Sequence, residues 1–214
     1  MRQVDVLIFD GVDELDLCGP VDVLASCCQT LAGRWGEKKA FRVQTVAERL
    51  GPIHTAHGMR ILPDKSLGQA MDSDIIIVPG GPAARKEHHP AGVLEWITKS
   101  SHTAELVCSI SSGVFILGRA GLLGGRKVTT HQTLIEELKR QFPKSTVISG
   151  VRYVEDGQTL LTSAGISAGI DAALRIVERF EGAACARLAA QRIEWPSPLL
   201  ISESPFEPAV GGRR

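Results

Sequence analysis

The sequence predicts an α/β fold in which a mainly parallel sheet lies between two layers of helices. Two observations indicate it: the strongest strand segments are apolar along their whole length, and helical segments alternate with them. A strand that is apolar on both faces needs a cover on each side, hence three layers. With 214 residues, 43% of them hydrophobic, the chain is long enough to bury a sizeable core.

The first third of the chain contains three such segments. We expect a buried strand over 4–9, where the run VDVLIF shows no alternation. Pro20 suits the first position of a helix, so a helix is expected over 20–32. The run AFRVQTVAE predicts a strand over 40–48. Turn residues and alternating apolar residues over 51–67 indicate a short hairpin or an edge segment.

The middle of the chain alternates most clearly between strands and helices. The run DSDIIIVP over 72–79 is the strongest strand signal in the sequence and is closed by a Pro-Gly-Gly turn. A helix over 91–101 follows, and then a strand over 104–110. The next helix is expected over 112–120, with Gly121 as a natural residue for its C-terminal turn.

The last third repeats the pattern once more. We expect a short strand over 127–131, a helix over 132–142, and two strands joined by an Asp-Gly turn over 146–165. A long helix is expected over 167–193, and Gly182 is the residue at which it would break.

One domain over residues 1–195 and an irregular tail over 196–214 are expected, because the tail holds four prolines and two glycines. Lys plus Arg balances Asp plus Glu at 24 each, so no basic field is available to bind nucleic acid or an anionic membrane. The first apolar run is too short for a leader or a spanning helix, and we expect a cytoplasmic protein.

The cysteines and histidines indicate no metal site. Five cysteines without a CxxC pair are typical of reduced thiols in a protein that has no disulfide framework. The histidines have no spacing typical of metal ligands. We therefore expect no metal site.

Three loops are expected to meet at the ligand-binding edge of the sheet. Parallel sheets bind ligands beyond the carboxyl ends of their strands, where loops lead into helices. In this chain those loops are 10–19, 79–82 and 110–113.

The stretch LVCSISSGVFILGRAGLL, 106–123, has the pattern of a nucleophile elbow, a sharp turn from a strand into a helix. An elbow needs small residues two positions before and two after the nucleophile, because neighbouring backbone approaches closely there. Ser111 meets this requirement with Ser109 and Gly113, whereas large apolar residues flank Cys108. The spacing therefore selects Ser111, and Cys108 is interpreted as a core thiol.

Four stretches in this order resemble the ThiJ/PfpI superfamily, which is related to class I glutamine amidotransferases: DELDLCGPVDVL, IIIVPGG, SSGVFILGRAGLLGGRKVTTH and LLTSAGISAGIDAAL. They are most similar to isocyanide hydratases and to the N-terminal domains of AraC-type regulators. The resemblance runs from Val4 to Trp195. It implies a flavodoxin-like three-layer sandwich that forms a homodimer.

The resemblance also implies roles for individual residues. Ser111 stands where the family usually has a nucleophilic cysteine, and Asp16 matches the acidic residue that contacts it. Gly81 and Ser112 match residues whose backbone N–H groups form an oxyanion-type hole, and His131 matches a histidine near the nucleophile in some branches. The predicted substrate-binding residues are Gly80, Gly81, Ser112, Gly113, Gly165 and Ile166.

The implied reaction is hydration of a small-molecule substrate, an isocyanide, to an N-substituted formamide, and it needs no metal or organic cofactor. A thiolate attacks the terminal carbon, and Asp16 supplies a proton and then helps to activate water. A serine hydroxyl ionises at far higher pH than a thiol and needs a general base. Asp16, with an ordinary pKa near 3.9, is too weak a base unless burial raises it by several units. His131 would be the alternative base, in a Ser-His-Asp arrangement.

Two explanations of Ser111 stay open at this point. Either the chain is a cysteine-to-serine form of a hydratase, or the serine is natural and the pocket binds a small molecule without turning it over, as a sensor would. Protease, glyoxalase and deglycase activities also occur in the superfamily, but Asp16 and Ser112 differ from the residues usually associated with them.

Overall fold

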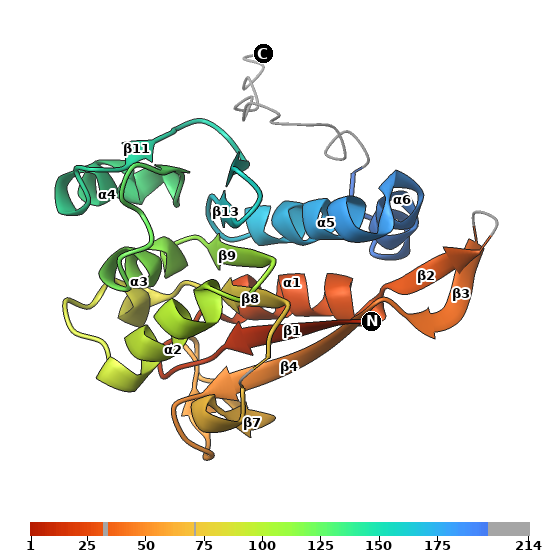
Figure 1. Ribbon diagram of the computed structural model, residues 1–214, viewed down its shortest axis with the longest axis horizontal. Helices are drawn as coiled ribbons and strands as arrows, with labels where there is room; N and C mark the ends of the chain where they lie inside the picture. Colours follow the sequence, from red (N-terminus) through yellow and green to blue (C-terminus); the bar gives the residue numbers. More distant parts are fainter. Residues whose placement is uncertain (32–33, 71, 197–214) are drawn as a thin grey trace, which may run out of the picture.

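The computed structural model describes residues 1–31, 34–70 and 72–196, which form a three-layer α/β sandwich (Figure 1). At its centre is a seven-stranded sheet in which neighbouring strands run parallel, except for the hairpin at one edge. In spatial order the strands are β12 (Tyr153–Asp156), β13 (Leu160–Ser163), β9 (Leu106–Ile110), β8 (Ile75–Val78), β1 (Arg2–Leu7), β4 (Phe41–Ala47) and β7 (Lys65–Ser66). The predicted fold class is confirmed.

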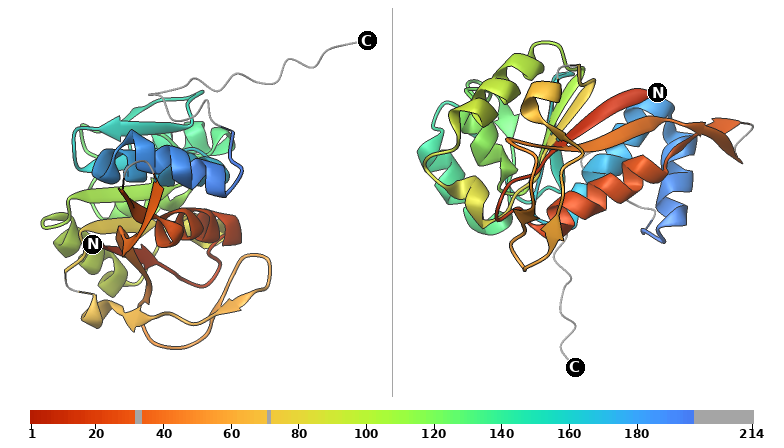
Figure 2. Two further views of the ribbon diagram at one scale, coloured as in Figure 1. Left: turned by 90° about the vertical axis from the view of Figure 1, so that its right-hand side faces the viewer. Right: turned by 90° about the horizontal axis from the view of Figure 1, so that it is seen from below.

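Helices cover both faces of the sheet (Figure 2). One face packs against α1 (Glu14–Ser26), α5 (Ala168–Glu181) and α6 (Ala183–Arg192), and the other against α2 (Ala91–Ser101), α3 (Gly113–Arg119) and α4 (Ile135–Gln141). Each face of the sheet has its own hydrophobic core, and alternate residues of β8 belong to the two cores. Ile75 and Ile77 pack in the first, and Ile76 and Val78 in the second. The continuous apolar run in the sequence therefore reflects burial on both sides.

Shorter elements connect these layers. Those in the described residues are β2 (Cys28–Leu31), β3 (Arg34–Lys39), β5 (Ile53–His54), β6 (Arg60–Ile61), β10 (Lys127–Val128), β11 (Thr146–Val147) and the 3₁₀ helices η1 (Leu67–Gln69), η2 (Pro82–Arg85) and η3 (Gln132–Leu134). The hairpin expected over 51–67 is the pair β5 and β6. Within the described residues, no helix combines the length and the apolar composition that crossing a membrane requires.

Helix α1 differs from the helix predicted over 20–32 at both ends. Asp13 caps it, and its Oδ1 accepts two backbone N–H groups of the first turn at 3.0 and 3.4 Å. Pro20 consequently lies inside the helix, because the aspartate cap outweighs the preference of proline for a first turn. The helix ends before β2 begins. Asp16 therefore belongs to the first turn of α1 and not to a loop.

Four other predicted segments lie in the second half of the chain. The strand predicted over 127–131 is shorter than expected, and the helix predicted over 132–142 divides into η3 and α4. The helix predicted over 167–193 does break at Gly182, whose φ of 87° suits a residue without a side chain. The irregular tail predicted over 196–214 lies, apart from its first residue, outside the described residues.

Candidate active site

Ser111 stands at the turn between β9 and α3 in a conformation that few residues adopt. Its φ is 52°, in the left-handed region, which costs a residue with a side chain about 1–2 kcal/mol. The Ser111 N–H is held between the carbonyl oxygens of Ser163 and Ala164, each at 3.2 Å, and its own carbonyl accepts the Thr130 hydroxyl at 2.8 Å. These contacts hold the turn in its strained conformation, so Ser111 is the residue at which the chain turns sharply from β9 into α3.

The residues around the elbow are small for the predicted steric reason. A Cβ on Gly113 would stand 2.0 Å from the carbonyl oxygen of Val78, so no larger residue fits. Ser109 is fully buried in β9. Cys108, also fully buried there, has its pKa raised by burial and by the charge of Glu155, which keeps it a thiol.

Asp16 is a buried carboxyl at the bottom of the site, with 1% of its surface exposed. Its Oδ2 accepts the Gly80 N–H at 3.1 Å, and its Oδ1 has no hydrogen-bond partner among the described residues. Burial, with help from the charge of Asp13, raises the pKa of Asp16 to about 7, against the opposing effect of the Gly80 N–H and the Ser111 hydroxyl. Asp16 can thus gain and lose a proton near neutral pH.

Gly80 and Gly81 bring the loop after β8 against the elbow. A Cβ on Gly80 would lie 2.5 Å from Asp16 Oδ2 and 2.7 Å from the Ser112 nitrogen. The Gly81 N–H, a predicted oxyanion donor, is not free: it donates to Ser112 Oγ at 2.9 Å, and that hydroxyl donates back to the Gly81 carbonyl at 3.0 Å. The Ser112 N–H, in contrast, has no acceptor among the described residues.

His131 forms one wall of the site but is bonded away from it. Its Nδ1 accepts the Thr133 N–H at 3.3 Å and lies 2.8 Å from the Thr133 hydroxyl, so the neutral ring carries its proton on Nε2. No hydrogen bond joins it to Ser111 or Asp16 in the part of the chain described. A Cβ on Gly165 would stand 1.8 Å from the ring, which explains a glycine there.

These groups border a cavity of about 220 Å³ at the carboxyl edge of the sheet. The predicted residues that line it are Asp16, Gly81, Ser111, Ser112, His131 and Ile166. Gly80, Gly113 and Gly165 shape it through the close approaches described above. Asp13 and Pro82 also line it and lie in two of the loops that were expected to meet here. Arg85, Thr133 and Leu134 line it as well, and no sequence signal pointed to them.

A second cavity, of about 370 Å³, shares His131 with the first. Arg152 lines it and pairs with the carboxylate of Asp171, which is 1% exposed. The Trp195 ring N–H donates to the other oxygen of that carboxylate at 2.8 Å, and Arg152 also bonds the Ser167 hydroxyl at 3.3 Å. No sequence motif marks this cavity, because its polar groups come together only in the fold.

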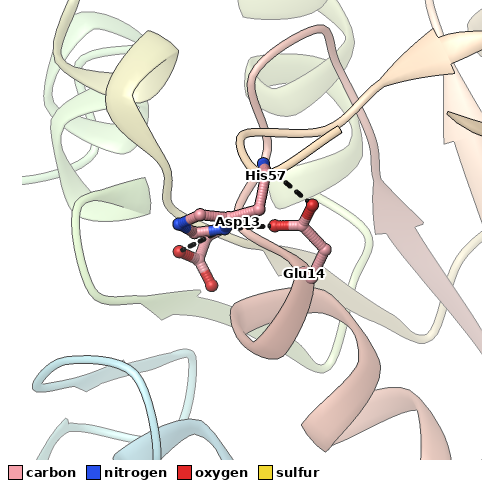
Figure 3. Close-up of side chains that lie close together, drawn as sticks. All are labelled: Asp13, Glu14 and His57. Atoms are coloured by element: carbon pink, nitrogen blue, oxygen red, sulfur yellow. Dashed lines mark hydrogen bonds and ion pairs between the residues drawn. The ribbon is translucent and has the colours of Figure 1, made fainter. Parts of the chain in front are cut away.

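Asp13, Glu14 and His57 bring their side-chain ligand atoms within 4.8 Å of one another beside the site (Figure 3). The sequence indicated no such group. Glu14 accepts the His57 N–H at 2.9 Å and lies 2.6 Å from His57 Nδ1. Desolvation acts to raise the pKa of Glu14, but hydrogen bonds from Thr55 and His57 lower it to about 2. Glu14 and His57 thus form an ion pair, and Asp13 lies beside them because it caps α1. These interactions explain why the three side chains lie together.

Comparisons with known proteins agree on the family of this chain. The DJ-1/PfpI family model matches residues 2–179. The chain is 32% identical to the isonitrile hydratase of Pseudomonas putida over 204 residues, 95% of this chain and 83% of that protein. A crystal structure of a ThiJ/PfpI family protein from Pseudomonas syringae matches with a TM-score of 0.76 and 27% identity, over 92% of this chain and 76% of that one.

A regulator is also among the relatives. The chain is 27% identical over 142 residues to the HTH-type transcriptional regulator CdhR of Pseudomonas aeruginosa. That match covers 66% of this chain but only 41% of the regulator. The relatives thus include both an enzyme and a transcription factor.

Proposed function

The chain belongs to the DJ-1/PfpI family, and from this we propose that its elbow site hydrates isocyanides to N-substituted formamides. The observation that carries the proposal is the pairing of a strained nucleophile position, Ser111, with a buried carboxyl whose pKa is about 7. The similarity to the isonitrile hydratase of Pseudomonas putida supports this choice of substrate class.

In the first step the Ser111 hydroxyl adds across the terminal carbon of the isocyanide. The Oγ–C bond forms as the hydroxyl proton passes to the Asp16 carboxylate, and Asp16 returns a proton to the same carbon. The product is a neutral imidate ester on Ser111. Because burial raises the pKa of Asp16, this carboxyl meets the condition under which an aspartate can serve as the base.

In the second step water attacks the imidate carbon while Asp16 takes one of its protons. The nitrogen is protonated, the carbon–Oγ bond breaks, and Ser111 recovers its hydroxyl proton. The net reaction adds one water to the isocyanide and releases the formamide. The open Ser112 N–H and the His131 Nε2–H are hydrogen-bond donors for the charge that develops, so His131 acts as a donor in this scheme and not as a base.

The test compares the protein with Ser111→Cys and Ser111→Ala. Each is incubated with an aryl isocyanide, and the formamide is followed by chromatography. We expect slow turnover by the serine protein, faster turnover by the cysteine variant because a thiol ionises far more readily, and none by the alanine variant. Inactivity of both the serine and the cysteine proteins would overturn the proposal.

The second candidate function is binding of a small molecule without turnover. It is favoured by the Gly80 and Gly81 N–H groups, which are occupied by Asp16 and by Ser112 and so unavailable to a developing negative charge. It predicts saturable binding of an isocyanide in calorimetry, unchanged in Ser111→Ala, with no formamide from any variant.

We further propose a cytoplasmic, single-domain homodimer that acts without metal or organic cofactor. Leu15 on α1 is 45% exposed, and a Cβ on Gly19 would lie within 4 Å of both the Leu15 and the Ile170 side chains, so apolar side chains of α1 and α5 are neighbours there. We propose that they contribute to an interface between two copies. Sedimentation of the protein and of Leu15→Glu tests it: the variant should run as a monomer.

A further inference from the structure

Two cysteines outside the elbow site lie in direct contact. The sulfur atoms of Cys27 and Cys185 are 3.1 Å apart, although 158 residues separate them in the chain, and both side chains are fully buried. Cys27 follows the last residue of α1, and Cys185 lies in the first turn of α6. These helix ends are neighbours on one face of the sheet (Figure 2).

The two thiols are close to the geometry of a covalent bond. A disulfide joins its sulfurs at about 2.05 Å, so the atoms must approach by about 1 Å more. The Cys185 thiol donates to the Cys28 carbonyl at 3.3 Å, which keeps it directed toward the end of α1. Gly182, the joint between α5 and α6, has φ 87°, and no other side chain lies within 4 Å of the place where its Cβ would stand, so the joint itself is uncrowded.

We propose that Cys27 and Cys185 form a reversible intramolecular disulfide when the protein is exposed to hydrogen peroxide. One thiolate attacks a peroxide oxygen, the O–O bond breaks, and a sulfenic acid forms as hydroxide leaves. The second thiol attacks that sulfur, the S–S bond forms, and water leaves. Two thiols are oxidised, one peroxide is reduced, and two waters are produced.

The surroundings of the pair predict how this reaction behaves. Burial raises the pKa of both thiols, so little thiolate is present. Burial and nearby carboxylates raise the pKa of Cys18 too, but its thiol is exposed, so the buried pair is expected to oxidise more slowly because peroxide reaches it less easily. Once formed, the bond is shielded from reductants. It joins the end of α1 to α6, while Asp16 stands at the opposite end of α1, so the oxidised protein is expected to keep its site and to unfold at a higher temperature.

The test uses a Cys18→Ser, Cys28→Ser double variant, which retains Cys27, Cys108 and Cys185 and changes neither proposed residue. After treatment with hydrogen peroxide and denaturation, the free thiols should fall from three to one, and dithiothreitol should restore three. Trypsin cleaves this chain after arginines that release 3–34 and 180–187, so the non-reduced digest should contain these two peptides joined.

Further variants give the matched controls. Adding Cys108→Ser should leave the joined peptides in place, whereas adding Cys185→Ala should abolish them. Survival of all three thiols, their loss without joined peptides, or a link through Cys108 would each overturn the proposal. Because the mapping is done on a chain that keeps both cysteines, the result does not depend on whether the Cys185 variant folds.

Discussion

Replacement of Asp16 by asparagine should make the protein more stable at alkaline pH and not at acid pH. The carboxyl has a pKa of about 7 in the folded protein, against an ordinary value of 3.8. Below pH 3.8 the carboxyl is protonated in both the folded and the unfolded states, so it does not change the free energy of unfolding. As pH rises from 3.8 to 7 the unfolded chain ionises first, so the folded state loses stability, and above pH 7 the loss is constant.

The size of the effect follows from the difference in pKa. One pKa unit is worth 1.36 kcal/mol, so a difference of about three units costs the native protein about 4 kcal/mol at high pH. Between pH 5 and pH 8 the cost grows by about 3 kcal/mol. An asparagine side chain does not ionise, so the stability of Asp16→Asn relative to the unchanged protein should rise by about 3 kcal/mol over this interval.

Urea denaturation of both proteins at pH 5, 6, 7 and 8 measures this difference. The difference between the two proteins removes the contributions of all other titrating groups, which are the same in each. A constant offset that asparagine causes by packing or hydrogen bonding also cancels, since only the change with pH is compared. Parallel stability curves from pH 5 to 8 would refute the reasoning, because the carboxyl would then titrate in its ordinary range.

Gly113→Ala should destabilise the fold by about 3 kcal/mol, because the new Cβ would stand 2.0 Å from a carbonyl oxygen of β8. Gly92→Ala, in an open part of α2, is the control and should stabilise the fold by about 0.5–1 kcal/mol, and urea denaturation measures both. Ser111→Gly should be about 1 kcal/mol more stable than Ser111→Ala in the same assay, since only glycine adopts φ 52° without strain, and a reversed order would count against a strained elbow. The hydrogen bond and charge of Glu14 raise the pKa of His57, so the protonated ring stabilises the folded state. His57→Ala should therefore lower the melting temperature most below pH 6.5, and the difference from the unchanged protein should vanish as pH rises through the raised pKa. Melting curves from pH 5 to 9 measure this difference. Formamide formation should show kcat/KM rising with pH about a midpoint near 7, where the buried carboxyl ionises; a midpoint near 4 would assign the base elsewhere.

The elements of the fold could be predicted because their causes are local. An apolar run such as Ile75–Val78 favours burial on both faces, and Gly182 can adopt the positive φ that ends α5 at little conformational cost. Helix α1 was misplaced because two local signals competed. Pro20 suggested a helix start, but the side chain of Asp13 satisfies two N–H groups that proline cannot.

The position of the elbow follows from the order of residues alone. An elbow needs close approach of neighbouring backbone, and Ser111 has small residues on both sides, whereas Cys108 has large ones. This requirement concerns residues that are near in sequence, so the sequence alone reveals it. The same stretch places a hydroxyl, that of Ser111, at the position for which we propose the nucleophile.

The chemical state of the groups around that position depends instead on the folded arrangement of distant segments. The pKa of Asp16 depends on how completely the loop after β8 excludes water from it, and the proton of His131 is placed by its bond to Thr133. Whether the Gly81 N–H is free depends on a hydroxyl 31 residues away, and the contact of Cys27 with Cys185 spans 158 residues. Desolvation and hydrogen bonding act through space, so the order of residues along the chain does not reveal them.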